Sequence, residues 1–151
     1  MKLESPSFKH EGEIPPKHTC DGQNTNPPLK ITEAPKEAKT LVLLMEDPDV
    51  PKTLRKDGMW DHWIVFNIPP ETTDIPEGME PLGTHGRGTA NNFNYHGPCP
   101  PDKRHRYYFK LYALDCYLDL PEGCSKKKVL ESMQGSILAE ATLMGTYERR
   151  K

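Results

Sequence analysis

The chain has 151 residues, of which 34% are hydrophobic and 16 are proline, and its formal net charge is −2 at pH 7. A chain of this length is expected to form one domain, residues 1–151, with a single hydrophobic core. The near-neutral charge argues against a general nucleic-acid-binding function, because such domains carry a strong basic excess. The prolines exclude a mainly helical fold, since proline lacks a backbone donor and clashes inside a helix.

The first apolar run follows a loop-rich segment, residues 1–40, and extends from Thr40 to Glu46. Its apolar residues stand at both odd and even positions, which predicts a strand buried on both faces. No apolar run approaches the roughly 20 residues that a membrane-spanning helix needs, and the first residues do not resemble a signal peptide. The sequence therefore predicts a soluble, cytoplasmic protein without membrane insertion.

Two further strands are predicted on either side of a long loop, residues 71–101, of the kind that often builds a site. The two-residue period of a strand places one set of side chains on a common face of residues 60–68: Trp60, His62, Ile64, Phe66 and Ile68. The same period groups a second set on one face of residues 105–114: His105, Tyr107, Phe109, Leu111 and Ala113. Charged residues mark the opposite face of residues 105–114 as wetter, so the second set is predicted to point inward.

One helix is predicted from Ser125 to about Glu140, because Ser125 can cap it and apolar residues recur at helical spacing. These apolar residues are Val129, Leu130, Met133, Ile137, Leu138 and Ala141. A closing strand is predicted from Thr142 to Arg149, with Gly145 as a bulge. The predicted fold class is mainly β: an antiparallel β-sandwich with one helix in the C-terminal region and long loops.

The four cysteines, Cys20, Cys99, Cys116 and Cys124, include no CxxC pair. A cytosolic domain of this size does not need disulfides, so free thiols are predicted. A loop disulfide between Cys20 and Cys99 is the alternative, and it depends on a distance that the sequence does not give.

Two pairs of inward side chains stand at the heads of predicted strands: Trp60 with His62, and His105 with Tyr107. If these strand ends are adjacent, the aspartates of the segment 47–51 complete a small cleft. Such a cleft suits an anion, because imidazolium and phenol groups donate hydrogen bonds to phosphate or carboxylate oxygens. A nearby carboxylate orients a histidine and favours its charged form, so binding is expected to weaken above about pH 6.5.

Other residues near this cleft have simpler explanations or supporting roles. Asp47 and Asp49 could fix a turn through side-chain hydrogen bonds, and the aromatic residues could serve only as core. Lys103 and Arg104 would stand at the cleft mouth and steer anions in. The basic clusters 126–128 and 149–151 are interpreted as solubilising surface. No role is assigned to the four remaining histidines, His10, His18, His85 and His96.

Two chemical alternatives use the same residues. A metal site could use the histidines and aspartates, and His62 and His105 could perform acid–base hydrolysis of a phosphoester. The sequence contains no HExxH, paired CxxC, GxSxG or glycine-rich phosphate-binding loop. The sequence therefore predicts a binding protein without a cofactor rather than an enzyme.

Several segments carry a combined signature along nearly the whole chain: His18-Thr-Cys-Asp-Gly22, Asp47-Pro-Asp-Val-Pro51, Asp61-His-Trp-Ile-Val65, Gly97-Pro-Cys-Pro-Pro101, His105-Arg-Tyr107 and Glu140-Ala-Thr-Leu-Met-Gly-Thr-Tyr147. In this order they resemble the phosphatidylethanolamine-binding protein family, also called the Raf kinase inhibitor protein family, and in particular its bacterial and archaeal branch. The combination is specific, whereas none of the segments is specific alone.

The resemblance implies a β-sandwich with a small pocket at one edge for phosphate, acetate or a phosphorylated head group. The implied pocket residues are Asp47, Trp60, His62, Pro101, His105 and Tyr107, with Asp49 supporting the loop. The resemblance also implies a homodimer that acts as a binding or regulatory protein towards a kinase, a protease or a lipid. A further alternative is a protease or kinase inhibitor that acts through its surface loops, with the pocket only structural. Residues 83–96 and the pair Lys103-Arg104 depart from the family pattern at the pocket mouth, so the choice of ligand is the property most affected.

Overall fold

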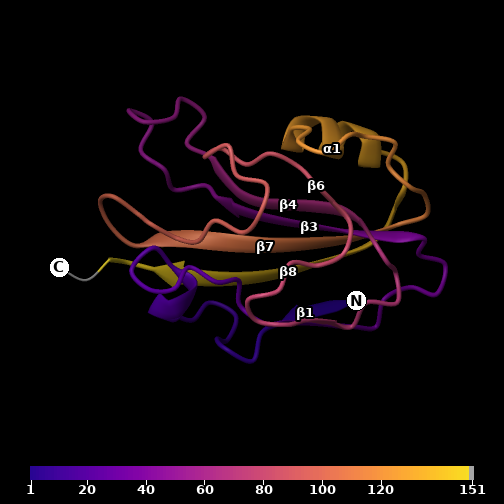
Figure 1. The fold of residues 1–151 in the computed structure, drawn as a ribbon, viewed down its shortest axis with the longest axis horizontal. Coiled ribbons are helices and arrows are strands. Elements are labelled where there is room, and N and C mark those ends of the chain that lie inside the picture. The colour runs from indigo at the N-terminus through magenta and orange to yellow at the C-terminus, as the bar shows by residue number, and fades with distance from the viewer. Residues whose placement is uncertain (150–151) are drawn as a thin grey trace.

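The computed structural model describes residues 1–149 and is mainly β, with two antiparallel sheets and one helix (Figure 1). The larger sheet has the order β6-β4-β3-β7-β8, and its strands are β3 (Thr40–Asp47), β4 (Trp60–Ile68), β6 (Thr84–His85), β7 (His105–Leu114) and β8 (Ile137–Tyr147). The smaller sheet has the order β1-β2-β5, with β1 (Lys2–Glu4), β2 (Leu29–Thr32) and β5 (Asp74–Ile75). A 3-10 turn covers Pro16–His18, and α1 covers Lys126–Met133. The predicted mainly β fold with antiparallel pairing is confirmed, and the description of the two sheets as a sandwich stays a prediction.

Strand β3 lies in the middle of the larger sheet and is buried on both faces, as its unbroken apolar run predicts. Leu41 and Leu43 pack in the core cluster that includes Leu3 and Ile31 of the smaller sheet. Val42 points the other way, into a second cluster that includes residues of α1. Figure 1 shows α1 on one side of the larger sheet and β1 on the other.

The predicted two-residue period of β4 is wrong, because the strand is interrupted by register shifts. Its pairing with β3 shifts between Met45 and Glu46 and again between Leu41 and Leu43, and at each shift β4 carries one more residue than β3. An extra residue turns the following side chains to the other face. Ile64 and Phe66 therefore pack in the cluster beside α1, whereas Ile68 packs in the cluster beside the smaller sheet.

Helix α1 is shorter than predicted, because it ends at Met133 and Gly135 follows with φ +82°. Glycine adopts this left-handed conformation readily, so the position breaks the helix. The residues from Ile137 onward pair with β7 as β8, and this ladder overrides their helical spacing. Of the predicted apolar helix face only Val129 and Met133 are buried, whereas Leu130 is 38% exposed.

The predicted closing strand from Thr142 to Arg149 begins too late and ends too late, because β8 covers Ile137–Tyr147. The predicted bulge at Gly145 is also wrong, since Tyr107 pairs with Gly145 in a continuous register. A Cβ atom at Gly145 would lie 2.6 Å from a side-chain carbon of Ile14 and 2.7 Å from one of Phe8. Glycine is required here because the chain packs closely against β8, not because the strand bulges.

Lys126 differs from the predicted solubilising role of residues 126–128. Its side chain is only 13% exposed, and its ammonium nitrogen lies 2.7 Å from a carboxylate oxygen of Glu46 and 2.6 Å from one of Asp61. Lys110 is also paired with Glu46. These ion pairs connect the start of α1 to β3 and β4.

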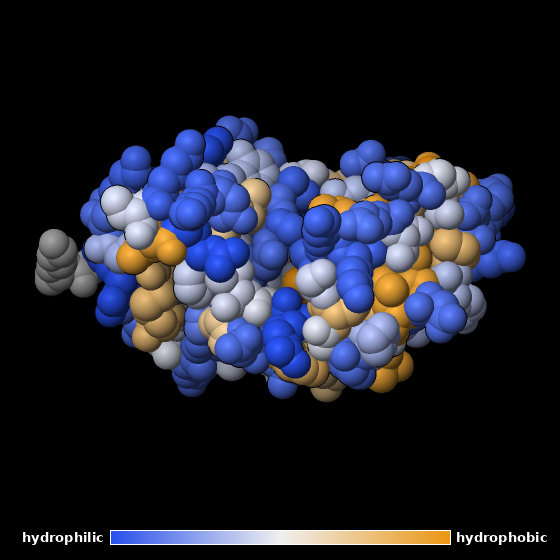
Figure 2. Space-filling model, turned by 90° about the horizontal axis from the view of Figure 1, so that it is seen from above, coloured by the Kyte–Doolittle hydropathy of each residue, from blue (hydrophilic) through white to orange (hydrophobic). Residues whose placement is uncertain are grey.

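Seen from above, the surface is mostly hydrophilic, with hydrophobic residues gathered in separate patches (Figure 2).

Cys20 and Cys99 form a disulfide with their Cα atoms 5.5 Å apart, so the prediction of free thiols is wrong for these two residues. Cys116 and Cys124 are free. Hydrogen bonds join the same two segments: the Cys20 N–H donates to the Pro98 carbonyl, and the Gly97 N–H donates to the side chain of Asn24. The two cysteines are 79 positions apart in sequence, so no local pattern indicates their contact.

No helix among residues 1–149 is long and apolar enough to cross a membrane.

Replacing Cys20 and Cys99 by serine is expected to lower the free energy of unfolding by about 2–5 kcal/mol, because the cross-link restricts the unfolded chain. Urea denaturation followed by circular dichroism measures this loss, and reduction of the wild-type protein should reproduce it. Cys116→Ser, which changes a free cysteine, is the matched control. Equal urea midpoints for oxidised and reduced wild-type protein would contradict the prediction.

Candidate functional site

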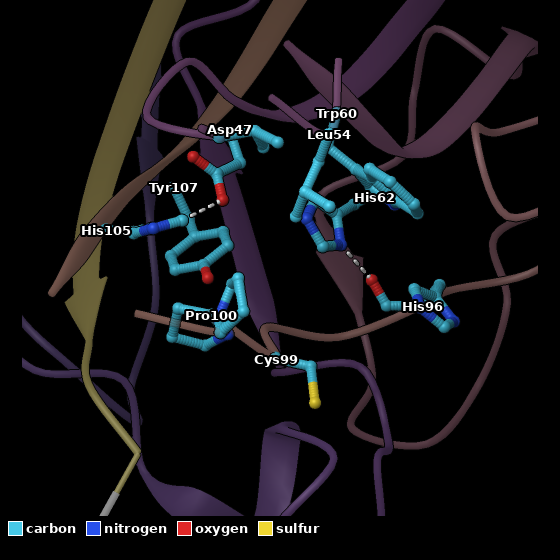
Figure 3. A pocket seen from close by; sticks show the side chains of 11 residues that line it. Asp47, Leu54, Trp60, His62, His96, Cys99, Pro100, His105 and Tyr107 are labelled. Atoms are coloured by element: carbon cyan, nitrogen blue, oxygen red, sulfur yellow. Dashed lines mark hydrogen bonds and ion pairs between the residues drawn. The ribbon is translucent and has the colours of Figure 1, made fainter. Parts of the chain in front are cut away.

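Three strand ends meet at one end of the larger sheet and form a cavity of about 220 Å³. Asp47 is the last residue of β3, Trp60 is the first of β4 and His105 is the first of β7. Because β3 is antiparallel to both β4 and β7, the last residue of β3 and the first residues of β4 and β7 lie at the same end of the sheet. The segments before β4 and before β7 contribute the rest of the lining: Val50, Leu54, His96, Cys99, Pro100 and Pro101, beside Asp47, Trp60, His62, His105 and Tyr107 (Figure 3).

Six of the seven predicted site residues line this cavity: Asp47, Trp60, His62, Pro101, His105 and Tyr107. Asp49 is not among the lining residues. Its carboxylate accepts hydrogen bonds from the backbone N–H and the guanidinium of Arg106, at 2.7–2.9 Å. These hydrogen bonds lower the pKa of Asp49, and they fasten the segment after β3 to the start of β7.

His105 is fully buried between two carboxylates. Its Nδ1 lies 2.6 Å from a carboxylate oxygen of Asp47, and its Nε2 lies 2.6 Å from one of Asp102. The other oxygen of Asp47 accepts the backbone N–H of Asp49. Burial raises the pKa of Asp47, although the hydrogen bonds from His105 and Asp49 oppose this shift. Both ring nitrogens of His105 are therefore already engaged by the protein.

His62 occupies the extra position of β4 and is 4% exposed. Its Nδ1 lies 2.6 Å from the backbone carbonyl oxygen of His96, and its ring meets Tyr107 edge to face with centroids 5.3 Å apart. Burial lowers the pKa of His62 from 6.5 to about 4, and the carbonyl of His96 only partly opposes this shift. The His62 ring is therefore uncharged at neutral pH, and its low pKa argues against the imidazolium form that is expected from the sequence to bind an anion below about pH 6.5.

Tyr107 presents a hydroxyl group at the cavity that is buried and has no hydrogen-bond partner among residues 1–149. Burial, together with the charge and the nearby acceptor oxygens of Asp47, raises the pKa of Tyr107, so the phenol keeps its proton. A buried polar group without a partner costs free energy, so an unsatisfied group in a native protein needs an explanation. This hydroxyl is one hydrogen-bond donor that the site offers to a ligand.

Sequence reasoning missed several lining residues because they come from irregular segments. His96 was assigned no role, yet its carbonyl sets the orientation of His62. Leu54 lines the cavity and is also 62% exposed, and Cys99 reaches the site through its disulfide with Cys20. For His96 and Cys99 the signals were the length of the loop and its family motif, neither of which indicates which residues turn inward, and Leu54 lies in a different segment, before β4.

The charged residues predicted at the cleft mouth lie outside the cavity lining. Arg104 contacts the hydroxyl of Thr146 and the carboxylate of Glu148 on β8 and just beyond it. Among residues 1–149, no group of three or more histidine, cysteine, aspartate or glutamate side chains is arranged to hold a metal ion. The cavity is lined by histidines, by the phenol of Tyr107 and for the most part by apolar walls.

The chain is a mainly β protein with a small cavity at one end of its larger antiparallel sheet, and comparison with known proteins gives its family. Residues 4–148 match the phosphatidylethanolamine-binding protein family, and the chain belongs to that family. A relative from Chlamydia trachomatis serovar D, named UPF0098 protein, is 48% identical over 149 residues, which cover 99% of each chain. A UPF0098 protein from Methanothermobacter thermautotrophicus is 45% identical and also covers 99% of each chain.

Solved structures agree with this assignment. The crystal structure of a phosphatidylethanolamine-binding protein homologue from Chlamydia trachomatis matches with a TM-score of 0.96 at 48% identity and covers 99% of this chain and 97% of that chain. Escherichia coli YbcL, described as a new member of the mammalian family, matches with a TM-score of 0.88 at 28% identity and covers 99% and 98%. The resemblance inferred from the sequence motifs is thereby confirmed.

The low pKa of His62 predicts a loss of stability in acid. Between pH 6.5 and about 4 the unfolded chain binds a proton at this residue and the folded chain does not, so the free energy of unfolding falls as the pH falls. The full shift corresponds to roughly 3 kcal/mol. Urea denaturation at several pH values between 4 and 7 measures the slope, and His62→Gln is expected to remove this share of it.

His10→Gln, which changes a histidine with a 55% exposed side chain, is the matched control for that series. If the slope of His62→Gln equals that of the wild-type protein, then the assignment of a neutral buried imidazole is wrong.

Proposed function

We propose that this chain binds a small phosphate-like ligand in the cavity, without turnover, and communicates its occupancy to a protein partner. The buried hydroxyl of Tyr107 carries the proposal, because it is a donor without an internal hydrogen bond at the wall of the cavity. An oxygen of phosphate or of a phosphorylated head group supplies an acceptor for it. The mostly apolar walls, which include Val50 and Pro100, suit the uncharged part of such a ligand.

The route to a partner runs through the segment after β3. Leu54 lines the cavity on one side and is 62% exposed on the other. A ligand in the cavity would therefore contact a side chain that also belongs to the protein surface. The partner is proposed to be a kinase or a protease, bound by a homodimer of this chain in the cytoplasm.

Phosphate and phosphoethanolamine are expected to raise the melting temperature, by about 5–10 °C at a hundredfold excess over Kd. Tyr107→Phe is expected to weaken binding about tenfold, because it removes one hydrogen bond to a charged ligand. The melting temperature of the free variant should stay close to that of the wild-type protein, since the hydroxyl has no internal partner. Differential scanning fluorimetry with a phosphate titration measures both effects.

Tyr112→Phe is the matched control, because it removes a hydroxyl from the same strand beside the opposite core cluster. Acetate and a zinc salt complete the ligand series. The proposal fails if neither phosphate compound shifts the wild-type protein, or if Tyr107→Phe binds as tightly as Tyr112→Phe. Stabilisation by zinc alone would instead favour a metal-assisted activity.

A further inference from the structure

The hydrogen bond between His62 and His96 determines which nitrogen of His62 carries the proton. A carbonyl oxygen can only accept, so the Nδ1 atom of His62 donates to the His96 carbonyl across 2.6 Å. The neutral ring then has an unprotonated Nε2, whose lone pair is a hydrogen-bond acceptor. This Nε2 makes no hydrogen bond to residues 1–149.

The orientation of the ring turns this acceptor to the cavity. Figure 3 shows one nitrogen of His62 turned to His96 and the remainder of the ring on the side of Asp47 and Tyr107. The Tyr107 ring lies edge to face against it at 5.3 Å, and its hydroxyl is a donor without a partner. The cavity wall therefore holds one free acceptor and one free donor next to each other.

His105 and Asp47, which also line the wall, are already engaged by the protein. Both nitrogens of His105 contact carboxylates, of Asp47 and of Asp102. Each oxygen of Asp47 already accepts one hydrogen bond, from His105 or from the backbone N–H of Asp49. Of these four side chains, His62 keeps an acceptor and Tyr107 a donor for a ligand.

We infer that the cavity selects an oxyacid group that still carries a proton, such as a phosphomonoester or phosphonate monoanion, and rejects the dianion. One ligand oxygen accepts from the Tyr107 hydroxyl, and the ligand O–H donates to Nε2 of His62. A dianion would place a second unprotonated oxygen against the lone pair of Nε2, without a hydrogen bond. This inference rests on the proposed function and specifies the protonation state of its ligand.

The proton that controls binding belongs to the ligand rather than to the protein. Burial, with the imidazoles of His96 and His105, lowers the pKa of His62 to about 4, so this ring stays neutral from pH 5 upward. Asp47 and Tyr107 are the other titratable groups that face it. A phosphomonoester loses its second proton near pH 6. Binding should therefore weaken above the second pKa of whichever ligand is used.

Two ligands of the same shape and different acidity test this inference. Isothermal titration calorimetry with methylphosphonate and with the more acidic difluoromethylphosphonate, from pH 5 to 8.5, gives the affinity of each ligand. Above its own second pKa, each is expected to lose about tenfold in affinity per pH unit. The two midpoints should differ by the difference in ligand pKa. A common midpoint for both ligands would assign the proton to the protein and overturn the inference while leaving the proposed function intact.

A monoanion without a proton provides the second test. Dimethyl phosphate carries one negative charge and no O–H, so at pH 5 it is expected to bind at least tenfold more weakly than methyl phosphate. Equal binding of the two would overturn the inference. If no phosphate or phosphonate probe binds at any pH, the proposed function itself fails and the inference fails with it.

The tautomer can be measured without any ligand. In ¹⁵N-labelled protein, Nδ1 of His62 is expected to carry a proton and Nε2 to remain unprotonated between pH 5 and 8. Two-dimensional ¹H–¹⁵N spectra of the imidazole rings distinguish the two nitrogens, and His62→Gln assigns the signals. A protonated Nε2 at pH 7 would overturn the inference whatever the affinities are.

Discussion

The antiparallel pairing of β3 with β4 on one side and β7 on the other is the constraint on which the site depends. Glu46 pairs with Tyr108, so the next residue of β3, Asp47, stands beside the start of β7 and meets His105. Taking both groups out of water is costly unless each is compensated. Asp49 and Asp102 supply the additional hydrogen bonds, which explains why the pair is built from the ends of two strands and the segments that adjoin them.

Adjacent residues of β3 have different environments on the two faces of the sheet: Glu46 is held by ion pairs, and Asp47 lines the cavity. Glu46 faces the helix side, where burial would raise the pKa of its carboxyl, but hydrogen bonds from Lys110 and Lys126 lower it overall. Asp47 faces the opposite side and borders the cavity. One buried carboxylate therefore attaches α1 to the sheet, and the next orients a histidine of the pocket. Because strand side chains alternate, this arrangement needs no loop between the two groups.

The sequence pattern predicted the orientation of site residues correctly on the strand whose alternation is unbroken. The period of β7 is unbroken, so the inward position of His105 and Tyr107 follows from alternation alone and is confirmed. On β4, alternation grouped His62 with Ile64, and a register shift that depends on pairing with β3 separates them. The disulfide and the boundary of α1 were mispredicted because they depend on distant chain segments: Cys20 on Cys99, and the residues after Gly135 on the ladder with β7.

The residue composition of the pocket does not by itself determine which of its groups donate hydrogen bonds to the cavity and which accept them. Two histidines and a tyrosine suggest a cluster of donors for a fully ionised anion, and in this arrangement the imidazoles of His62 and His105 do not act as donors to the cavity. His105 is saturated by carboxylates, and His62 gives its N–H to a carbonyl 34 positions further along the chain. The position of that carbonyl leaves a lone pair at the cavity beside one phenolic proton. The proposed ligand preference therefore depends on which nitrogen of His62 is protonated, and the His96 carbonyl in the loop before β7 determines that.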